Sequence, residues 1–372
     1  ARLSKKGAKG TKRAAGSKKK STSIWRWLLF FSLKIGVVLM LFAAIGMFYL
    51  DAQIREKFEG KRWSLPAKVY ARPLEIYSGL SLSIADLKVE LKGLGYRSVK
   101  KVSGPGQVEF ATSRVRVFTR GFDFADGREF SSKLTISFKN GTIFKITAEN
   151  GSPVAIARLE PILIGGIYPK NNEDRDLIRL SQAPKGLVDA LITIEDRSYY
   201  DHFGVSPVGI ARAMWVNLRV GRFVQGGSTL TQQLIKNFYL TSERTLIRKL
   251  IEMPMAIVLD FRYSKDEILE AYLNEVYLGQ EGSRAVHGFG LASQYFFSRP
   301  IGELQLHQVA LLAAMVKGPS YYDPRRRPQR AKKRRDLVLK VMAQNDVISD
   351  AQYRDAIAKP LSVVKQKSLH KG

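Results

Sequence analysis

The sequence predicts a membrane-anchored multidomain protein: one N-terminal transmembrane helix, then a small α+β domain, then a mostly α-helical domain. Three observations predict this architecture. Residues 24–50 are a long apolar run, residues 67–150 alternate apolar with polar side chains, and from about residue 153 apolar residues recur at helical spacing. With 372 residues, of which 45% are hydrophobic, the chain is long enough to bury more than one core.

Residues 1–23 are a basic tail. Residues 1–20 contain nine Lys or Arg, and no acidic residue precedes Asp51. A segment so rich in Gly, Ser, Ala and Lys has too little apolar surface to offset the entropy of folding, so we expect the tail to be disordered.

Residues 24–50 have the length and composition of a transmembrane helix. Their only charges are Arg26 and Lys34, and the tryptophans near their start are typical interfacial anchors. A cleaved signal peptide would have a shorter apolar core. The positive-inside rule then predicts that the basic tail stays in the cytoplasm and that everything after Asp51 lies on the other side of the membrane.

The net charge is +28, and the part of the chain after residue 50 keeps +17 of it. Such an excess predicts anionic partners, and export disfavours nucleic acid, which leaves lipid headgroups, phosphates or wall polymers. The chain has no cysteine, which is compatible with export.

Residues 51–66 predict a short helical stalk, and residues 67–152 predict the small α+β domain. Its strands alternate in polarity, and the stretch KNGT supplies an Asn-Gly hairpin turn. One helix fits between the first strands, with Ser83 as its N-cap and Gly93 or Gly95 at its end. No cluster of chemically active residues lies here, so we expect an interaction or spacing module.

Residues 153–365 predict one helical domain of ordinary size. Residues 366–372 would begin a linker. The segments with helical spacing are residues 183–196, 226–240, 245–263, 265–279 and 303–318.

The first candidate for chemistry is ITIEDRSYYDHFG, residues 192–204. It places Glu195 and Asp196 side by side behind an apolar run. Burying an unpaired carboxylate is costly and raises its pKa. Either the two acids are paired and structural, or one of them is tuned for proton transfer.

The second candidate is QGGSTLTQQLIKN, residues 225–237. Thr229 and Gln232 match the capping-box pattern, and a glycine-rich turn that opens a helix is also a natural phosphate site. Structural capping is the default interpretation. Lys236 favours phosphate, because helical spacing places it on the face of Gln233.

The third candidate is a polar stripe in the next helix. Arg244, Arg248 and Glu252 follow at intervals of four, with Lys249 beside them. A solvated ion pair is the default explanation. Pro254 should kink or break the helix, and a kink beside a carboxylate favours a site.

Two further basic segments leave alternatives open. Residues 205–224 mix bulky apolar residues with three arginines. This composition fits two alternatives equally well: a helix at the membrane surface, or an ordinary core helix with exposed arginines. Residues 325–335, RRRPQRAKKRR, are either a lipid-headgroup site or a solvated charge run, and the charge run is the default.

Other chemistries fit the sequence less well. The four histidines show no paired spacing for a metal, and there is no G-x-S-x-G elbow. What remains is two separated carboxylates, a helix start suited to phosphate, and a set of Lys and Arg side chains. A glycosyl transfer with a diphosphate leaving group would need these groups.

These stretches together resemble the five motifs of glycosyltransferase family 51, the peptidoglycan polymerases of class A penicillin-binding proteins. In family order, across about residues 155–365, the matches are EDRSYYDHFG, GGSTLTQQLIKN, RKLIE, KDEILEAYLNEVYLG and ALLAAMVKGPSYYDP. The tail, the single span and the α+β domain are similar to the type-1b branch, whose extra domain resembles UvrB domain 2. The resemblance implies a lysozyme-like helical fold for the last domain.

The resemblance implies that the protein polymerises lipid II into β-1,4-linked glycan, with inversion at the donor C1 and release of undecaprenyl diphosphate. Glu195 is then the general base for the acceptor's 4-hydroxyl, and we expect partial desolvation to raise its pKa toward the working pH. Glu252 is the second catalytic carboxylate, and we expect Asp196 to be a structural neighbour of Glu195. The residues that match phosphate-binding and sugar-binding positions are Asp196, Ser228, Thr229, Gln233, Lys236, Arg244, Arg248 and Lys249.

The resemblance also implies the setting of the reaction. No cofactor is obligatory, and a divalent cation, Mg²⁺ or Mn²⁺, at the diphosphate is compatible with it. The expected partners are lipid II, the growing glycan chain, the bacterial inner membrane and other wall-synthesis proteins, with an activating outer-membrane lipoprotein at residues 67–152. The catalytic domain would be periplasmic.

The sequence departs from the family at two positions. Tyr199 replaces the usual Phe, which should be tolerated, and Pro254 lies where a helix normally continues. The Lys-Thr-Gly motif of the family's transpeptidase domain is absent, so we expect a fragment of a longer bifunctional protein.

Two alternatives stay open. A lytic transglycosylase also needs a glutamate in a lysozyme-like fold, but it has little use for an Arg and Lys cluster. A catalytically silent scaffold acting through residues 67–150 is disfavoured because both Glu195 and Glu252 are present.

Overall fold

The computed structural model describes residues 21–63, 67–167, 176–222, 226–239, 246–282 and 284–364. The chain divides into two compact units, Ala1–Gln53 and Ile54–Gly372. Residues 1–20 of the predicted tail and Pro66 at the end of the predicted stalk lie outside the described residues.

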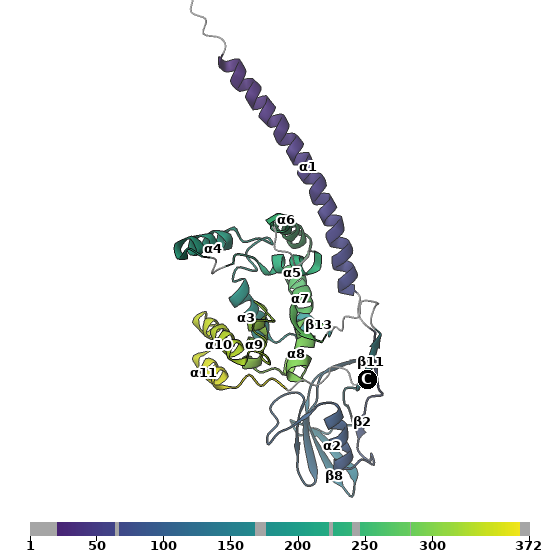
Figure 1. Ribbon diagram of the computed structural model, residues 1–372. Helices are drawn as coiled ribbons and strands as arrows, with labels where there is room; N and C mark the ends of the chain where they lie inside the picture. Colours follow the sequence, from purple (N-terminus) through teal and green to yellow (C-terminus); the bar gives the residue numbers. More distant parts are fainter. Residues whose placement is uncertain are drawn as a thin grey trace, which may run out of the picture. The chain divides into compact units, whose positions relative to one another are not determined.

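The first helix, α1 (Ser21–Trp63), runs without interruption through the predicted transmembrane span and into the predicted stalk (Figure 1). It begins at Ser21, inside the segment predicted to be disordered. Over Trp25–Gly60 it is long and apolar enough to cross a membrane, and it is the one such helix in the described part of the chain. The prediction of an N-terminal helix able to span a membrane is therefore confirmed.

The last turns of α1 belong to the second unit. Ile54 and Phe58 are fully buried there. The Phe58 ring lies 4.3 Å from the ring of Tyr263, and Tyr239 donates a hydrogen bond to the Ile54 carbonyl at 2.9 Å. The end of α1, which was predicted to be a stalk, therefore packs against the helical domain.

The α+β domain is built on a five-stranded sheet in the order β3-β4-β5-β8-β9. Its first pair, β3 with β4, is parallel and the other pairs are antiparallel. The strands are β3 (Arg97–Ser98), β4 (Gln107–Phe110), β5 (Arg114–Phe118), β8 (Lys133–Lys139) and β9 (Thr142–Ala148).

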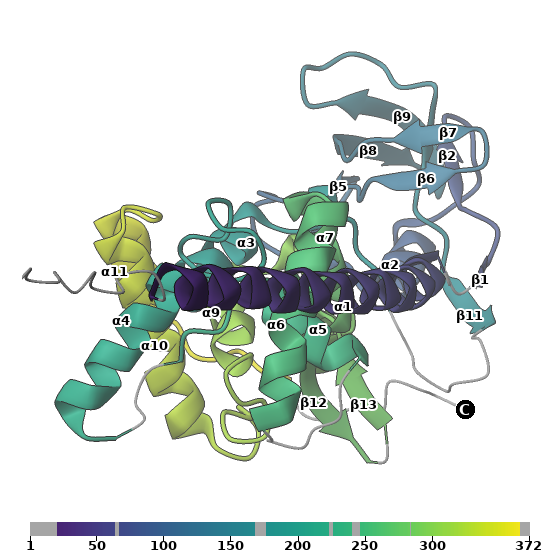
Figure 2. The same ribbon diagram turned by 90° about the horizontal axis from the view of Figure 1, so that it is seen from above.

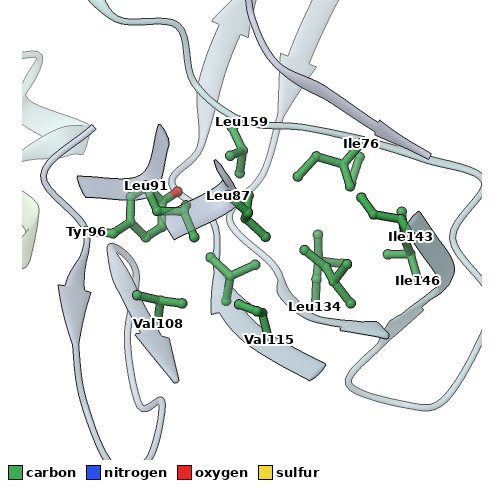
Figure 3. Close-up of a cluster of buried hydrophobic side chains, with 13 residues drawn as sticks. Ile76, Leu87, Leu91, Tyr96, Val108, Val115, Leu134, Ile143, Ile146 and Leu159 are labelled. Carbon is green, nitrogen blue, oxygen red and sulfur yellow. The ribbon is translucent and has the colours of Figure 1, made fainter. Parts of the chain in front are cut away.

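Helix α2 (Ile84–Gly93) supplies side chains to the same core as this sheet (Figure 3). Leu87 and Leu91 of α2 are buried in one cluster with Val115 and Ile143 of the strands. The strand members are the apolar positions of the alternating pattern, because successive side chains of a strand point to opposite faces.

Two local predictions for this domain are confirmed. Ser83 is the N-cap of α2 and forms a capping box with Asp86, and α2 ends at Gly93. Asn140 and Gly141 join β8 to β9 with φ angles of 51° and 74°, as a two-residue hairpin with left-handed residues requires.

The α+β part extends past residue 152, where the sequence placed its end. Later strands return to pair with its first strands, β10 with β2 and β1 with β11. These strands are short and their partners are distant in sequence, so no local pattern marks them. The short pairs are β1 (Ala67–Tyr70) with β11 (Leu163–Ile167), β2 (Glu75–Tyr77) with β10 (Ile156–Arg158), and β6 (Phe122–Phe124) with β7 (Gly127–Glu129).

The remaining residues form the helical domain, with one β-hairpin visible in Figure 2. The five segments predicted to be helical correspond to α3, α5, α6, α7 and α9. The elements are η1 (Leu180–Gln182), α3 (Lys185–Glu195), α4 (Pro207–Val220), α5 (Leu230–Tyr239), α6 (Leu246–Arg262), α7 (Lys265–Glu275), β12 (Tyr277–Glu281), β13 (Arg284–His287), α8 (Phe289–Phe297), η2 (Ile301–Glu303), α9 (Leu306–Met315), α10 (Pro328–Gln344) and α11 (Asp350–Ala358).

Helix α9 lies at the centre of this domain. Every residue from His307 to Met315 is buried, as expected for a helix that is apolar on all sides. It packs against α3, α8, α10 and α11. The central helix therefore fixes α3 and α10, the two helices that meet at the site described below.

The helix that contains Pro254 does not break there. α6 continues from Leu246 to Arg262 with Pro254 inside it, so of the two predicted outcomes, a kink or a break, the break was wrong. A proline removes the hydrogen bond to the carbonyl four residues earlier. That residue, Leu250, is 69% exposed, so water can reach this turn, while Met255 and Leu259 beyond the proline are buried and hold the helix in place.

Candidate functional site

A cavity of about 440 Å³ opens beside the C-terminal end of α3. Its lining includes two carboxylates and four positively charged side chains. The lining residues are Thr193, Ile194, Glu195, Asp196, Arg197, Arg212, Gly226, Ser228, Gln233, Lys317 and Arg334.

Glu195 is the last residue of α3, and its carboxylate faces a donor on each oxygen. Gln233 of α5 donates from Nε2 to Oε2 at 3.1 Å, and a guanidinium nitrogen of Arg334 of α10 lies 3.8 Å from Oε1. The Glu195 side chain is 14% exposed. It is therefore a partly buried carboxylate that still reaches the cavity.

Tyr272 of α7 sets the orientation of the Gln233 amide. Its hydroxyl donates to Gln233 Oε1 at 3.0 Å, so Gln233 Nε2 is the atom left to face Glu195. Burial, and after it the charges of Glu195 and Asp196, raise the pKa of Tyr272 well above its ordinary value. The hydroxyl thus stays protonated and remains a donor.

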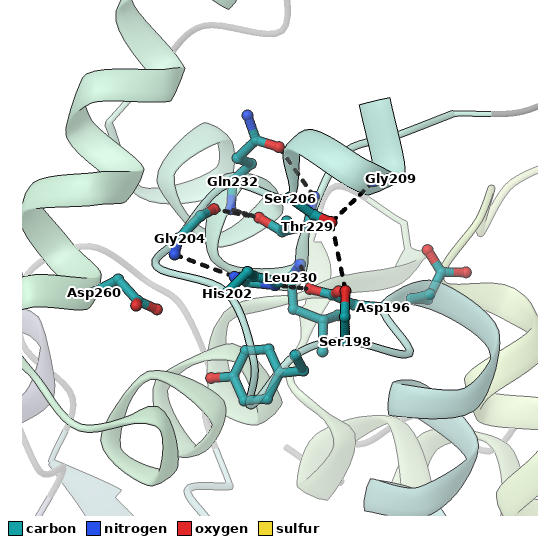
Figure 4. A network of polar contacts seen from close by, with 12 residues as sticks. Asp196, Ser198, His202, Gly204, Ser206, Gly209, Thr229, Leu230, Gln232 and Asp260 are labelled. Carbon is teal, nitrogen blue, oxygen red and sulfur yellow. Dashed lines mark hydrogen bonds and ion pairs between the residues drawn. The ribbon is translucent and has the colours of Figure 1, made fainter. Parts of the chain in front are cut away.

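Asp196 is bound to groups inside the protein (Figure 4). One of its oxygens, Oδ2, accepts a hydrogen bond from the backbone N–H of Leu230 at 3.0 Å and lies 2.9 Å from His202 Nε2. Its side chain is 4% exposed. The fold separates the two adjacent acids: Asp196 is buried and paired, and Glu195 faces the cavity.

The loop after Asp196 is bound to the start of α5. The Thr229 hydroxyl donates to the carbonyl of Gly204 at 2.6 Å, and the Gly204 N–H donates to His202 Nδ1 at 3.1 Å (Figure 4). Gly204 has φ +81°, and an added Cβ would lie 2.2 Å from the carbonyl oxygen of Ala256. Only glycine fits where the loop passes so close to α6.

The capping interpretation of the α5 start is confirmed. Thr229 and Gln232 exchange backbone-to-side-chain hydrogen bonds at 3.0 and 3.1 Å, which is the predicted capping box. The Leu230 N–H is bound to the Asp196 carboxylate, which also suits the positive end of the helix dipole. These N–H groups are occupied within the protein and are not left for a phosphate.

A second charged cluster lies on α6. Glu252 is 2% exposed, and it pairs with Arg248 at 3.0 Å and with Lys249. Lys249 also donates to the Ser228 hydroxyl at 2.9 Å, and Ser228 lines the cavity. The predicted solvated ion pair therefore has a buried carboxylate, and it holds a partly exposed lysine at the edge of the cavity.

The structure brings together most of the predicted site residues. Glu195, Asp196, Ser228 and Gln233 line the cavity, with the α6 cluster one contact away. Thr229 is 2% exposed and committed to its cap. Among the other predicted binding residues, Lys236 is exposed in the last turn of α5 and Arg244 lies outside the described residues. Their roles in binding substrate stay predictions.

Sequence reasoning missed Arg334 because residues 325–335 read as a solvated charge run. That interpretation was wrong for part of the run. Arg334 is 10% exposed and lines the cavity, and Arg335 is fully buried and donates to the Lys359 carbonyl at 2.9 Å. A helical period was visible in the sequence, since Ala331 and Arg335 lie on one face with the apolar residues that follow.

The substitution of Phe by Tyr at position 199 is accommodated as expected. The Tyr199 ring is fully buried, and its hydroxyl donates to the Lys265 carbonyl at 2.6 Å. The extra oxygen therefore has a partner and carries no desolvation penalty.

Helix α4 presents bulky apolar side chains to solvent. Met214 is 67% exposed, Trp215 67% and Leu218 79%, and they line an apolar groove of about 740 Å³. Figures 1 and 2 both show α4 at the edge of the helical domain. The exposed apolar side chains of α4 therefore argue against the alternative of an ordinary core helix for this segment.

Nothing in the described part of the chain brings three His, Asp or Glu side chains together as a metal site would require. A divalent cation at this site would need oxygen ligands from the substrate.

Comparisons with known proteins match both domains. Residues 162–343 match the family described as transglycosylase, and residues 76–159 match the second domain of bifunctional transglycosylases, UB2H. The helical domain is thus similar to transglycosylases, and the α+β domain is similar to UB2H domains.

The relatives narrow this class to one branch. Penicillin-binding protein 1B of Vibrio cholerae is 47% identical over 99% of this chain and 48% of its own length, and that of Escherichia coli is 43% identical over 89% and 39%. The chain therefore contains a glycosyltransferase family 51 domain and a UB2H domain, and these relatives are type-1b class A penicillin-binding proteins. It spans less than half the length of these curated relatives.

A solved structure, penicillin-binding protein 1A from Haemophilus influenzae, aligns with a TM-score of 0.31 and 21% identity, over 55% of this chain and 20% of that chain. A score this low supports no structural argument.

Proposed function

We propose that this chain is a peptidoglycan glycosyltransferase that polymerises lipid II into β-1,4-linked glycan strands. The observation that carries the proposal is the position of Glu195. It reaches a cavity of about 440 Å³ from the end of α3, among four cationic side chains. A carboxylate next to positive charge suits a reaction that takes a proton and releases a diphosphate.

Glu195 accepts the proton of the acceptor's 4-hydroxyl as that oxygen attacks C1 of the lipid-linked donor sugar. The new C1–O bond forms on the face opposite the leaving group, so the configuration at C1 inverts. The bond from C1 to the diphosphate breaks, and undecaprenyl diphosphate leaves with the electron pair. Positioning of this kind and a general base together supply much of the rate of such a transfer.

The α6 cluster supplies positive charge for the diphosphate. Lys249 reaches the cavity edge at Ser228, and Arg248 and Lys249 share the buried carboxylate of Glu252. Glu252 keeps two cations close together that would otherwise repel each other. Its role in the proposal is to hold these cations, and the proton transfer belongs to Glu195.

The membrane supplies the substrate in this proposal. Helix α1 anchors the chain in the bacterial inner membrane with the basic tail in the cytoplasm and the catalytic domain in the periplasm. The exposed apolar residues of α4 would enter the headgroup region, where a lipid-linked substrate is found. We further propose that residues 67–152 receive an outer-membrane lipoprotein activator and that the whole protein also carries a transpeptidase.

The test is polymerisation of fluorescent lipid II by the full chain in detergent. Wild type should give long chains that lysozyme digests, and Glu195→Gln should lower the rate at least about a hundredfold, because Gln cannot accept the proton. Asp201→Asn is the matched control, since Asp201 is exposed in the same loop and should leave the rate unchanged.

Two results would contradict the proposal. Cleavage of preformed glycan without polymer formation would favour a lytic transglycosylase. Binding of lipid II without either reaction would favour a catalytically silent scaffold.

A further inference from the structure

Arg334 contacts the Glu195 carboxylate from a helix that no sequence motif assigned to the site. Its guanidinium nitrogen lies 3.8 Å from Glu195 Oε1, while Gln233 donates to Oε2. The two donors come from α10 and α5, and Glu195 comes from α3. The carboxylate is thus held between two helices other than its own.

The position of Arg334 is fixed by its neighbours. α10 packs against both α3 and α9. The next residue, Arg335, is fully buried and donates to backbone carbonyls at the end of α11 at 2.9 and 3.4 Å, which fixes the rotation of α10 about its axis. The guanidinium of Arg334 lies 5.9 Å from the ring of Tyr322.

The two adjacent arginines differ in how they use their donors. Arg335 donates hydrogen bonds to backbone carbonyls and to Asp336, as a structural arginine does. Arg334 is 10% exposed, its buried Nε has no hydrogen-bond partner in the described part of the chain, and its charge faces Glu195. Desolvating a guanidinium for one long ion pair does little for stability, which points to a role at the site.

We propose that Arg334 is a positioning residue that, opposite Gln233, fixes the Glu195 carboxylate in the cavity. At 3.8 Å the guanidinium orients Oε1 without saturating it, so an acceptor hydroxyl can still reach that oxygen. Without Arg334 the carboxylate would be held on one side only and could rotate out of line. This inference rests on the proposed function of Glu195 as the base.

The kinetic test uses the full chain with lipid II in detergent. Arg334→Gln should lower kcat at least tenfold and change KM by less than twofold, because positioning acts on the chemical step. Arg334→Lys keeps the charge and should recover at least a third of the wild-type kcat. Arg330→Gln is the matched control. Arg330 is on α10 like Arg334, but it is exposed, and its guanidinium lies 4.6 Å from the ring of Tyr321.

Two kinetic results would overturn the proposal. An unchanged kcat in Arg334→Gln would show that Glu195 is positioned without it. A raised KM at unchanged kcat, with no rescue by lysine, would make Arg334 a substrate-binding residue instead.

A second measurement does not depend on activity or on the proposed reaction. Carbodiimide coupling of an amine to carboxylates, located by tandem mass spectrometry, should be at least threefold faster at Glu195 in Arg334→Gln than in wild type, because the guanidinium no longer covers and pairs with it. Coupling at the exposed Asp201 should be unchanged. An unchanged rate at Glu195 would overturn the positioning role even if wild type polymerises lipid II. If wild type does not polymerise lipid II but the coupling rate at Glu195 rises as expected in Arg334→Gln, the proposed function is wrong and the positioning role of Arg334 stands.

Discussion

Two adjacent carboxylates in this protein have opposite surroundings because a helix ends between them. Glu195 closes α3 with helical geometry, and Asp196 has φ −156° and ψ 76°, which directs its side chain away from the helix. Asp196 then accepts a backbone N–H from α5 and contacts His202. One acid is free to face the cavity because the other holds the loop and α5 in place.

Removing Asp196 should therefore destabilise the fold. Asp196→Ala leaves the Leu230 N–H and His202 without their buried partner and should lower the free energy of unfolding by about 3 kcal/mol. Chemical or thermal unfolding in detergent measures this loss. Asp201→Ala, at an exposed carboxylate in the same loop, should change stability by less than about 0.5 kcal/mol. Equal effects of the two changes would contradict the structural role.

At the residue level the sequence predicted some roles and missed others. Glu195, Ser228 and Gln233 could be named because they lie in short motifs with a recognisable spacing. Arg334 could not, since its importance comes from α10 packing beside α3. A contact between helices that are distant in sequence leaves no trace in either local pattern.

At the level of elements, the site depends on the loop between α3 and α4 passing close to α6. Gly204 is the point of closest approach, with its amide bound to His202 and its carbonyl bound to Thr229. Periodicity predicted the helices around this point well, because each has an apolar face. It could not predict α6 continuing through Pro254, which depends on packing of the residues that follow.

The close approach at Gly204 predicts a strong effect of one methyl group. Gly204→Ala combines a left-handed backbone with a Cβ 2.2 Å from the Ala256 carbonyl oxygen, so it should cost about 3 kcal/mol or more of stability. The measurement is the unfolding midpoint in detergent. It should be accompanied by loss of polymerase activity, because the same loop carries Asp196.

Gly221→Ala separates backbone strain from steric overlap. Gly221 ends α4 with φ +69°, but no atom lies within 4 Å of an added Cβ. This change should cost only about 1 kcal/mol. If both substitutions cost the same, overlap with α6 is not what makes Gly204 necessary.

At the level of the whole molecule, a buried charge network joins the α+β domain to the helical domain. Arg120 of the α+β domain pairs with Glu160 at 2.7 Å and with Glu303 of η2 in the helical domain. Arg97 lies 3.8 Å from the same Glu303, whose side chain is 5% exposed. Removal of Glu303 would leave Arg120 and Arg97 without this counter-charge from the other domain.

Glu303→Gln should therefore uncouple the two domains. The two arginines lose their buried counter-charge, so we expect one cooperative thermal transition to separate into two, with the first several degrees lower. Scanning calorimetry or proteolysis during heating detects the separation. Glu109→Gln, which removes an ion pair with Arg116 inside the α+β domain alone, should keep a single transition. A single transition in both variants would show that the network does not couple the domains.

The order of domains could be predicted from composition alone, because the anchor, the alternating segment and the helical segment differ in pattern. The junction between the last two could not, because β10 and β11 pair with strands at the start of the α+β domain. The Arg120 network is likewise invisible in sequence, since its members are widely separated.

The α4 groove and the Glu195 cavity have a practical consequence for anyone seeking an inhibitor. The groove is lined by Met214, Trp215 and Leu218 and will collect lipophilic fragments in a screen that ranks compounds by affinity. The cavity sets four cationic side chains around the base, so a neutral fragment gains little there and an anionic one gains more. Compounds selected for affinity alone will therefore bind mainly at α4, which holds no reacting group. A competition assay with an anionic probe would identify the compounds that bind in the Glu195 cavity.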